Sequence, residues 1–290
     1  MNRKRIALVV IVLAAVSLAC TWSGPFPVSD VKVGPTQESA LTLEPVGAPG
    51  ETARLELGMG AGELMLHPGQ GDALLTGTVT YNIADFEPEV AIDGTRVTVN
   101  QGDLQLEGIP NLRGDEVINR WDLELGGQPI DLQVNAGAYQ ADLDLGGISL
   151  TGLQISDGAA SVRLAFSNPN PVSMDTFRYV TGASDVRMQG LANANFSQMR
   201  FEGGAGSFDL EFGGDLRQDA EIRIEAGLSS VRIVVPAGVP ARAEVQGELS
   251  EVVADSGWSG SGSSYVHPGE GPALTFIINS SLGSVRLETD

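Results

Sequence analysis

One apolar pattern recurs along residues 131–290 and constrains the fold more than any other feature of the sequence. In residues 132–143, which set the pattern, two alternating apolar residues precede a central glycine and two more follow it. Similar copies lie at 153–164, 177–188, 199–210 and 222–233, and looser copies, with Glu248 and Ser281 in the glycine slot, lie at 243–254 and 276–287. The central glycines, Gly137, Gly158, Gly182, Gly204 and Gly227, are 21 to 24 residues apart. This period indicates stacked units, because one unit of this size cannot bury its apolar side alone.

Within each copy the apolar residues alternate with a period of two, which is typical of strands and not of helices. A third apolar pair, such as Ile148 and Leu150, falls between consecutive copies. Three short strands per turn of roughly 22 residues are typical of a parallel β-solenoid. An antiparallel meander is the alternative, although the Asn-Gly and Asp-Gly turns that it needs are nearly absent. We therefore predict an all-β chain: an N-terminal β module followed by a parallel β-solenoid-like stack of roughly 22-residue repeats.

Charge and composition exclude one class of partner. The chain has 290 residues, a formal net charge of −20 and a single cysteine. Binding to nucleic acid requires clustered Lys and Arg against the phosphates, so we expect no nucleic acid partner. A lone cysteine forms no internal disulfide, and stability therefore has to come from packing.

Residues 1–19 have the pattern of a targeting segment. Three basic residues at positions 3–5 precede an apolar stretch, and Cys20 follows the small residue Ala19. The segment resembles a bacterial lipoprotein signal peptide, although Ser17 stands where that family usually carries Leu. The resemblance implies that Cys20 is lipidated and holds the protein to a membrane outside the cytoplasm. The alternative is an ordinary secreted protein with a free thiol.

Composition also divides the rest of the chain. Residues 20–50 are rich in Pro, Gly and Ser, which predicts a tether, with short alternations at 31–33 and 41–43 that can add a strand. We expect the N-terminal β module at residues 51–118 and the solenoid domain at residues 119–290.

The stretch 51–118 resembles the N-terminal domain of the bacterial toast-rack family. The likeness rests on residues 53–66 (ARLELGMGAGELML), 76–82 (TGTVTYN) and 88–90, and residues 121–125 and 130–145 fit its continuation. Residues 231–239 and 282–287 (LGSVRL) are similar to adhesin-like and cell-wall-stress-response β domains. The resemblance implies a β fold and a cell-surface setting, and it transfers no catalytic residues to this chain.

No constellation of residues predicts catalysis. His67 and His267 each begin a His-Pro-Gly-x-Gly turn, in which Pro fixes φ and Gly accepts positive φ. A reused turn explains these histidines better than a shared metal site. The Gly- and Ser-rich residues 259–262 have no His partner for a nucleophilic site. We therefore expect no enzymatic activity, no cofactor and no metal.

Stacking the copies aligns outward side chains into columns. One column contains Asp142, Arg163, Arg187, Asp209 and Arg232, and another contains Gln133, Gln154, Arg178, Arg200, Arg223 and Glu244. Because neighbouring strands lie about 4.8 Å apart, we expect Arg200 to pair with Glu202 or Glu225, and Asp209 with an arginine on an adjacent rung. One interpretation is a solvated ladder that fixes the register. The other is a basic stripe for an anionic cell-wall polymer or lipid headgroups, formed by Arg163, Arg178, Arg187, Arg200, Arg223 and Arg232.

These features predict a non-enzymatic, lipid-anchored, extracytoplasmic envelope protein with a structural, adhesive or sensing role. Its partners would be the membrane, through the lipid on Cys20, and cell-wall polymer or envelope proteins. The alternative is a glycan- or cell-wall-polymer-binding module that combines the arginine stripe with exposed aromatic side chains, for which the candidates are Tyr139, Phe166 and Tyr179.

The ends of the stack require protection, because an open solenoid has unpaired strand edges. We expect residues 51–118 to cover the first rung, since Gly60 lies in a copy of the rung motif. At the other end, we expect the insertion at 254–272 to fold back over the last rungs, with Trp258 as its apolar contact. Residues 288–290 would then place charge on the exposed edge.

Overall fold

The computed structural model describes residues 28–30, 33–102, 109–111, 117–247 and 249–290, in two units. In the smaller unit, β1 (Val28–Asp30) pairs in parallel with β7 (Ile109–Asn111). The larger unit comprises Gly34–Asp103 and Val117–Asp290 and contains one sheet of 16 strands. The predicted site residues that the structure describes all belong to the larger unit.

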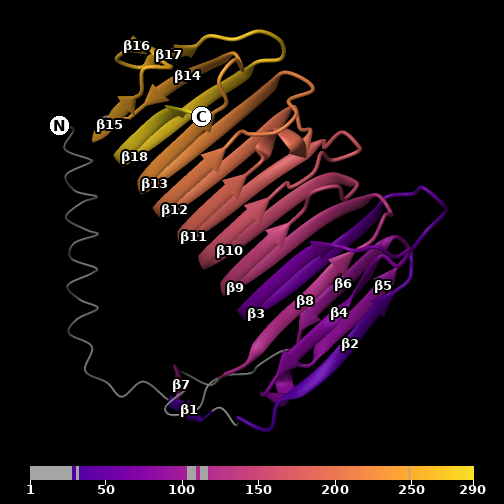
Figure 1. Cartoon of the computed structure of the whole chain (residues 1–290). Helices are drawn as coiled ribbons and strands as arrows, with labels where there is room; N and C mark the ends of the chain where they lie inside the picture. The colour runs from indigo at the N-terminus through magenta and orange to yellow at the C-terminus, as the bar shows by residue number, and fades with distance from the viewer. Residues whose placement is uncertain (1–27, 31–32, 103–108, 112–116, 248) are drawn as a thin grey trace. The chain divides into compact units, whose positions relative to one another are not determined.

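Long parallel strands of 14 to 16 residues form the body of the larger unit (Figure 1). They are β3 (Ala53–Pro68), β9 (Ile130–Asp144), β10 (Leu150–Ala165), β11 (Thr176–Gln189), β12 (Gln198–Glu211), β13 (Ala220–Val235) and β18 (Leu274–Thr289). They lie side by side in this order, and every neighbouring pair is parallel. The prediction of a parallel β-solenoid-like stack is confirmed, and each long strand is one rung.

Each rung contains both halves of one sequence copy. On β9, Leu132 and Val134 are buried before Gly137, and Ala141 and Leu143 are buried after it. The inward positions change from even to odd numbers at the glycine, so the strand changes direction there while both halves face the core. The first two strands expected in each turn are therefore one continuous bent strand.

The third side of each turn is a loop that also faces the core. Leu145 and Ile148, which follow β9, are at most 2% exposed. Hydrogen bonds between backbones link these loops from one rung to the next, for example from Leu145 N to Ala165 O at 2.8 Å. A short 3-10 helix, η2 (Leu191–Ala194), replaces part of this side after β11. Aromatic rings fill the space between loop and strand, and the rings of Phe177 and Phe196 meet edge to face at 5.5 Å.

The central glycines are required because adjacent rungs approach closely. A Cβ added at Gly182 would lie 2.3 Å from the carbonyl oxygen of Gly158, and one at Gly204 would lie 2.5 Å from that of Gly182. The same contact recurs from Gly137 to Gly227, and none of these glycines has a positive φ. The repeat therefore preserves glycine to allow close approach of backbones, and not to allow an unusual backbone angle.

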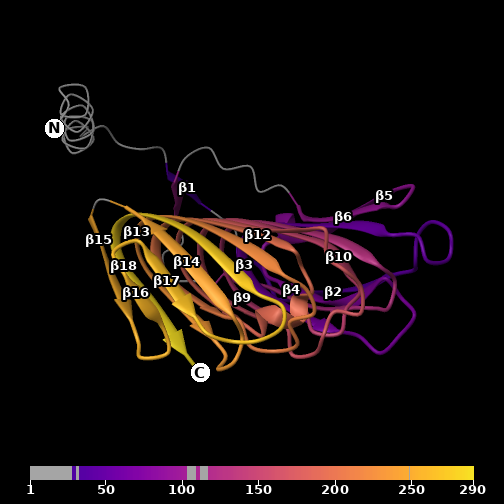
Figure 2. The ribbon, with the colours of Figure 1, turned by 90° about the horizontal axis from the view of Figure 1, so that it is seen from above.

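The first rung is covered on its outer side by shorter strands. The outer edge of β3 pairs with β6 (Arg96–Gln101) along its first half and with β8 (Asn119–Leu125) along its second half. Beyond β8 lie β4 (Leu75–Tyr81) and β2 (Gln37–Leu43), and β5 (Pro88–Asp93) pairs with β6 in a hairpin that extends to the side in Figure 2. A 3-10 helix, η1 (Ala84–Phe86), precedes β5. The expected cover of the first rung is present.

The sheet includes parts of the chain on both sides of the expected domain boundaries. The alternation at 41–43, which the sequence indicated could add a strand within the 20–50 stretch, is the end of β2, with Leu41 and Leu43 buried. The sheet also continues across the boundary expected between 118 and 119, since β3 pairs with both β8 and β9.

The last copies of the repeat are not stacked in chain order. The copy at 243–254 forms two short strands, β14 (Ala241–Gln246) and β15 (Leu249–Ala254), and β18 lies between them and β13. Bulk explains this arrangement: β18 brings Phe276 and Ile278 into the core where β14 has Ala243 and Val245. The copy with larger inward side chains takes the position that is buried on both sides. The expectation that residues 288–290 charge an exposed edge is therefore wrong.

The insertion after β15 folds back as expected. It forms the hairpin of β16 (Ser259–Ser261) and β17 (Ser264–His267), and β17 pairs antiparallel with β14. Trp258 is 6% exposed, its ring lies 5.3 Å from that of His267, and its Nε1 donates a hydrogen bond to Glu288 O at 3.4 Å. The hairpin therefore covers the β14 half of the last rung.

Candidate functional site

The strongest candidate site is a column of three arginines on the outer face of the first strand halves. Arg178, Arg200 and Arg223 are register partners on β11, β12 and β13. We call them the first arginine ladder. Their side chains are 42%, 49% and 54% exposed, so each is partly covered by its surroundings. The predicted alignment of this column is confirmed.

Acidic side chains pair with every member of the first arginine ladder. Arg178 Nη2 and Arg200 Nε both lie 2.8 Å from Glu202 Oε1. Arg200 Nη2 also lies 3.0 Å from Glu225 Oε1, as the sequence predicts. Arg223 Nη2 lies 2.7 Å from Glu221 Oε1. These pairs combine three positive with three negative charges, so the ladder carries no spare charge.

Glu202 is the most constrained of these acids. The hydrogen bond from Arg178 lowers the pKa of the Glu202 carboxyl, although partial burial acts in the opposite direction, and Arg200 adds to the lowering. Glu202 therefore stays ionised at neutral pH and holds two guanidinium groups in fixed positions.

A shallow hollow of about 300 Å³ lies over the first arginine ladder. Its lining comprises Asp175, Thr176, Phe177, Arg178, Gln198, Met199, Arg200, Glu221 and Arg223. Buried Phe177 and Met199 form part of the lining, while the charged side chains are partly open to solvent. The hollow thus offers hydrogen-bonding groups from three successive rungs.

The other arginines of the predicted stripe lie on the second strand halves, after the glycine column. Arg163, Arg187 and Arg232 occupy the column that also contains Asp142 and Asp209. We call these three the second arginine ladder. Asp209 pairs with Arg187 at 3.4 Å and with Arg232 at 2.9 Å, which confirms the expected pairing.

The structure does not bring the six predicted arginines into one stripe. Arg178 and Arg187 are both on β11, nine residues apart, which corresponds to about 30 Å of extended strand. The bend at the glycine column turns the two ladders toward different directions. A single ligand site therefore includes the first or the second ladder, and only the first lines the hollow described above.

The aromatic side chains expected on the surface are in the core. Tyr139, Phe166 and Tyr179 are 5%, 1% and 0% exposed. Tyr139 lies inward because the alternation changes phase at Gly137 and places position 139, like 141 and 143, on the inner face. Tyr179 lies on the inward alternation that precedes Gly182, and Phe166 is buried directly after the end of β10. The prediction that they contact a glycan is wrong.

A buried polar cluster surrounds Asp157 and was missed from the sequence. Tyr179 Oη donates to Asp157 Oδ2 at 2.7 Å, Thr181 donates to Asp157 Oδ1, and Ser184 donates to the same oxygen at 3.3 Å. Burial, and then the charge of Asp157, raises the pKa of Tyr139 above its usual value. Burial likewise raises the pKa of Tyr179, with Tyr139 and Asp157 adding to the effect. The available signal was that Asp157 and Thr181 share one register position beside the glycine column.

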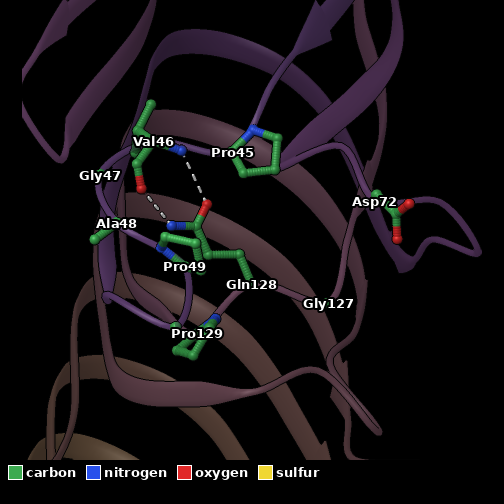
Figure 3. Close-up of a pocket in the computed structure, with 10 residues that line it drawn as sticks. Pro45, Val46, Gly47, Ala48, Pro49, Asp72, Gly127, Gln128 and Pro129 are labelled. Atoms are coloured by element: carbon green, nitrogen blue, oxygen red, sulfur yellow. Dashed lines mark hydrogen bonds between the residues drawn. The ribbon is translucent and has the colours of Figure 1, made fainter.

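A second hollow, of about 510 Å³, lies among loops near the start of the stack (Figure 3). Its wall includes Pro45, Pro49, Pro129 and Asp72. Gln128 donates to Val46 O at 2.6 Å and accepts from Val46 N at 3.1 Å, as the dashed lines show. The Gln128 amide is therefore used to fix the loop, and the wall is mainly apolar.

The remaining sequence expectations concern Cys20, the histidines and metals. Cys20 lies outside the described residues. His267 Nδ1 contacts Val239 O at 2.7 Å within the hairpin cover, which is a structural role. Within the described residues, no group of three or more His, Cys, Asp or Glu is placed to hold a metal ion. The same part of the chain contains no helix that is long and apolar enough to cross a membrane.

Bent parallel rungs with in-register outward columns define a β-solenoid-like protein. The chain belongs to the toast-rack family, because residues 32–177 match the model of the N-terminal domain of toast_rack. The resemblance stated for residues 51–118 is confirmed, and the match extends as far as β11.

The comparison with solved structures found proteins from several bacteria. A "putative cell adhesion protein" from Clostridium sporogenes is 15% identical, with 88% of this chain and 100% of that chain covered and a TM-score of 0.47. A "putative adhesin" from Bacteroides fragilis is 8% identical, with 89% and 99% covered and a TM-score of 0.33. A "putative lipid binding protein" from Parabacteroides distasonis is 11% identical, with 91% and 100% covered and a TM-score of 0.34. No curated protein matches the chain. Likenesses at these levels support no conclusion about ligand or activity.

Proposed function

We propose that this chain is a non-enzymatic, lipid-anchored module of the bacterial envelope with a structural or adhesive role outside the cytoplasm. The observation that carries the proposal is the in-register stack of rungs. Its inward columns are filled by apolar side chains such as Leu132, Ile155 and Ile224, each at most 1% exposed. Function therefore falls to the outward faces, which repeat the same kind of side chain about every 4.8 Å.

A polymer-binding role is the second candidate, and the hollow over the first arginine ladder favours it. Arg178, Arg200 and Arg223 present the same group on three successive rungs, and a polymer also presents the same group repeatedly. The partners proposed are therefore cell-wall polymer or envelope proteins at this face. The membrane is the partner at the N-terminus, through a lipid on Cys20.

The anchor is tested by replacing Cys20. The Cys20→Ala protein is expected to lose its association with the membrane or to keep its leader, because lipidation requires the cysteine thiol. Cell fractionation with mass spectrometry of the mature N-terminus measures both. Ser23→Ala, a small change three residues away, serves as the control and should leave a lipidated, membrane-bound protein. Membrane association of a Cys20→Ala protein at mature size would contradict the proposed anchor.

A further inference from the structure

The charge state of the first arginine ladder restricts the ligands that it can take. Each guanidinium already has a carboxylate at 3.0 Å or less, on Glu202, Glu225 or Glu221. An anionic ligand would have to compete with these carboxylates or add negative charge beside them. It would also approach a chain whose formal net charge is −20. A polyanion is therefore disfavoured at this face.

The same ion pairs leave hydrogen-bonding capacity unused. A guanidinium has five N–H donors, and the recorded ion pairs of Arg200 use its Nε and one terminal nitrogen. The carboxylates of Asp175 and Glu221 line the hollow, and Glu221 pairs with Arg223 through Oε1, which leaves its Oε2 to accept from a ligand. The arginine side chains are about half exposed, so donors recur along the hollow at the spacing of the rungs, and Asp175 and Glu221 add acceptors.

We propose that the hollow binds a neutral, hydroxyl-rich polymer, that is, an uncharged glycan chain lying along the stack. A sugar hydroxyl both donates and accepts a hydrogen bond, so it fits a surface that carries both guanidinium and carboxylate groups. The aliphatic parts of the partly buried arginine side chains supply apolar surface beside the sugar. The inference rests on the proposed function and names the ligand class of its outward face.

Calorimetric titration of the full chain tests the ligand class. The probes are three uncharged oligosaccharides, cellohexaose, maltohexaose and the N-acetylglucosamine hexamer, together with inorganic polyphosphate as the polyanion. At least one uncharged oligosaccharide is expected to bind saturably, with an affinity that changes less than about twofold between 50 and 500 mM salt, because screening acts on charged ligands. Binding of polyphosphate alone, or of no probe, would overturn the inference.

Arg200→Lys separates hydrogen-bond geometry from charge. Lysine keeps the positive charge but loses the planar fork that spans Glu202, Glu225 and the ligand. We expect this variant to bind the oligosaccharide about tenfold more weakly or worse, which is the range for losing a hydrogen bond to a charged group. Arg54→Lys is the matched control. Arg54 is 55% exposed and pairs with Asp131 at 3.2 Å, and it lies on β3, away from the rungs that carry the first arginine ladder. Equal affinities of the two variants would overturn the placement of the site.

Failure of the ligand class and failure of the proposed function give different results. If polyphosphate alone binds and Arg200→Lys retains that binding, the face recognises charge, and the adhesive role survives with another ligand. If no probe binds the wild-type chain, the polymer-binding role fails at this face. The test of the anchor on Cys20 is independent of either result.

Discussion

Ile224→Asp is expected to lower the free energy of unfolding by more than about 4 kcal/mol, or to prevent folding, because it buries an unpaired charge. Ile224 is 0% exposed on β13 and lies between Phe201 of β12 and Ile278 of β18. Its neighbours in this inward column are apolar, so the carboxylate would find no cation there. Urea denaturation followed by circular dichroism measures the loss.

Gln154→Asp is the control for this change, since it introduces the same side chain at an outward position. Gln154 is the register partner of Gln133 and Arg178, and it is partly exposed on β10. We expect a change of less than about 0.5 kcal/mol. Similar losses for Ile224→Asp and Gln154→Asp would mean that the assignment of inward and outward columns is wrong.

Gly182→Ala is expected to destabilise the stack by about 2–3 kcal/mol, because the added methyl group meets backbone that cannot give way. The new Cβ would lie 2.3 Å from Gly158 O, and Gly182 O in turn lies under Gly204. The contact between the β10 and β11 rungs would therefore have to open. Chemical denaturation of the purified variant checks the size of the effect.

Gly213→Ala is the matched substitution at a glycine without such a contact. A Cβ at Gly213 has no heavy atom within 4 Å, and Gly213 has no positive φ. Its stability should therefore equal or slightly exceed that of the wild-type chain. If Gly182→Ala proves as harmless as Gly213→Ala, close approach of the rungs does not explain the glycine column.

Much of the stack can be predicted from the sequence, because its period and its inward pattern are both local features. The copies containing Gly137, Gly158, Gly182, Gly204 and Gly227 align in the structure as they align in the sequence. The pairing of Arg200 with Glu225 follows from that alignment and a rung spacing of about 4.8 Å, while Glu202 lies two residues from Arg200 on the same face of β12.

The features that were not predicted depend on contacts between distant segments. The insertion of β18 beside β13 reflects the greater bulk of Phe276 and Ile278, which matters only once the segments compete for one position. The separation of Arg178 from Arg187 depends on the bend at Gly182, which alternation alone does not show.

The phase change at the central glycine also explains the wrong prediction for Tyr139. Tyr139 follows Gly137 by two positions, and the shift in alternation turns it inward, where it is 5% exposed. Asp157 is at the same corner and is buried with hydroxyl partners from β11, Tyr179 and Thr181. A carboxylate in a mostly polar sequence context gives no local sign of burial, because its partners are more than 20 residues away.

The central claim is that consecutive repeats stack as parallel rungs in the stated register, and disulfide formation between engineered cysteines tests it most directly. Ser161 and Asp185 are exposed register partners on β10 and β11, while Ser207 lies one rung further, on β12. The Cα atoms of register partners on adjacent strands lie about 4.8 Å apart, within the range of about 4.4–6.8 Å that a disulfide spans. The Cα atoms of register partners two rungs apart lie outside this range. In a Cys20→Ala background, the pair Ser161→Cys with Asp185→Cys is expected to oxidise readily. The pair Ser161→Cys with Ser207→Cys should stay reduced within the monomer. Rapid oxidation of the second pair, or none of the first, would contradict the stack.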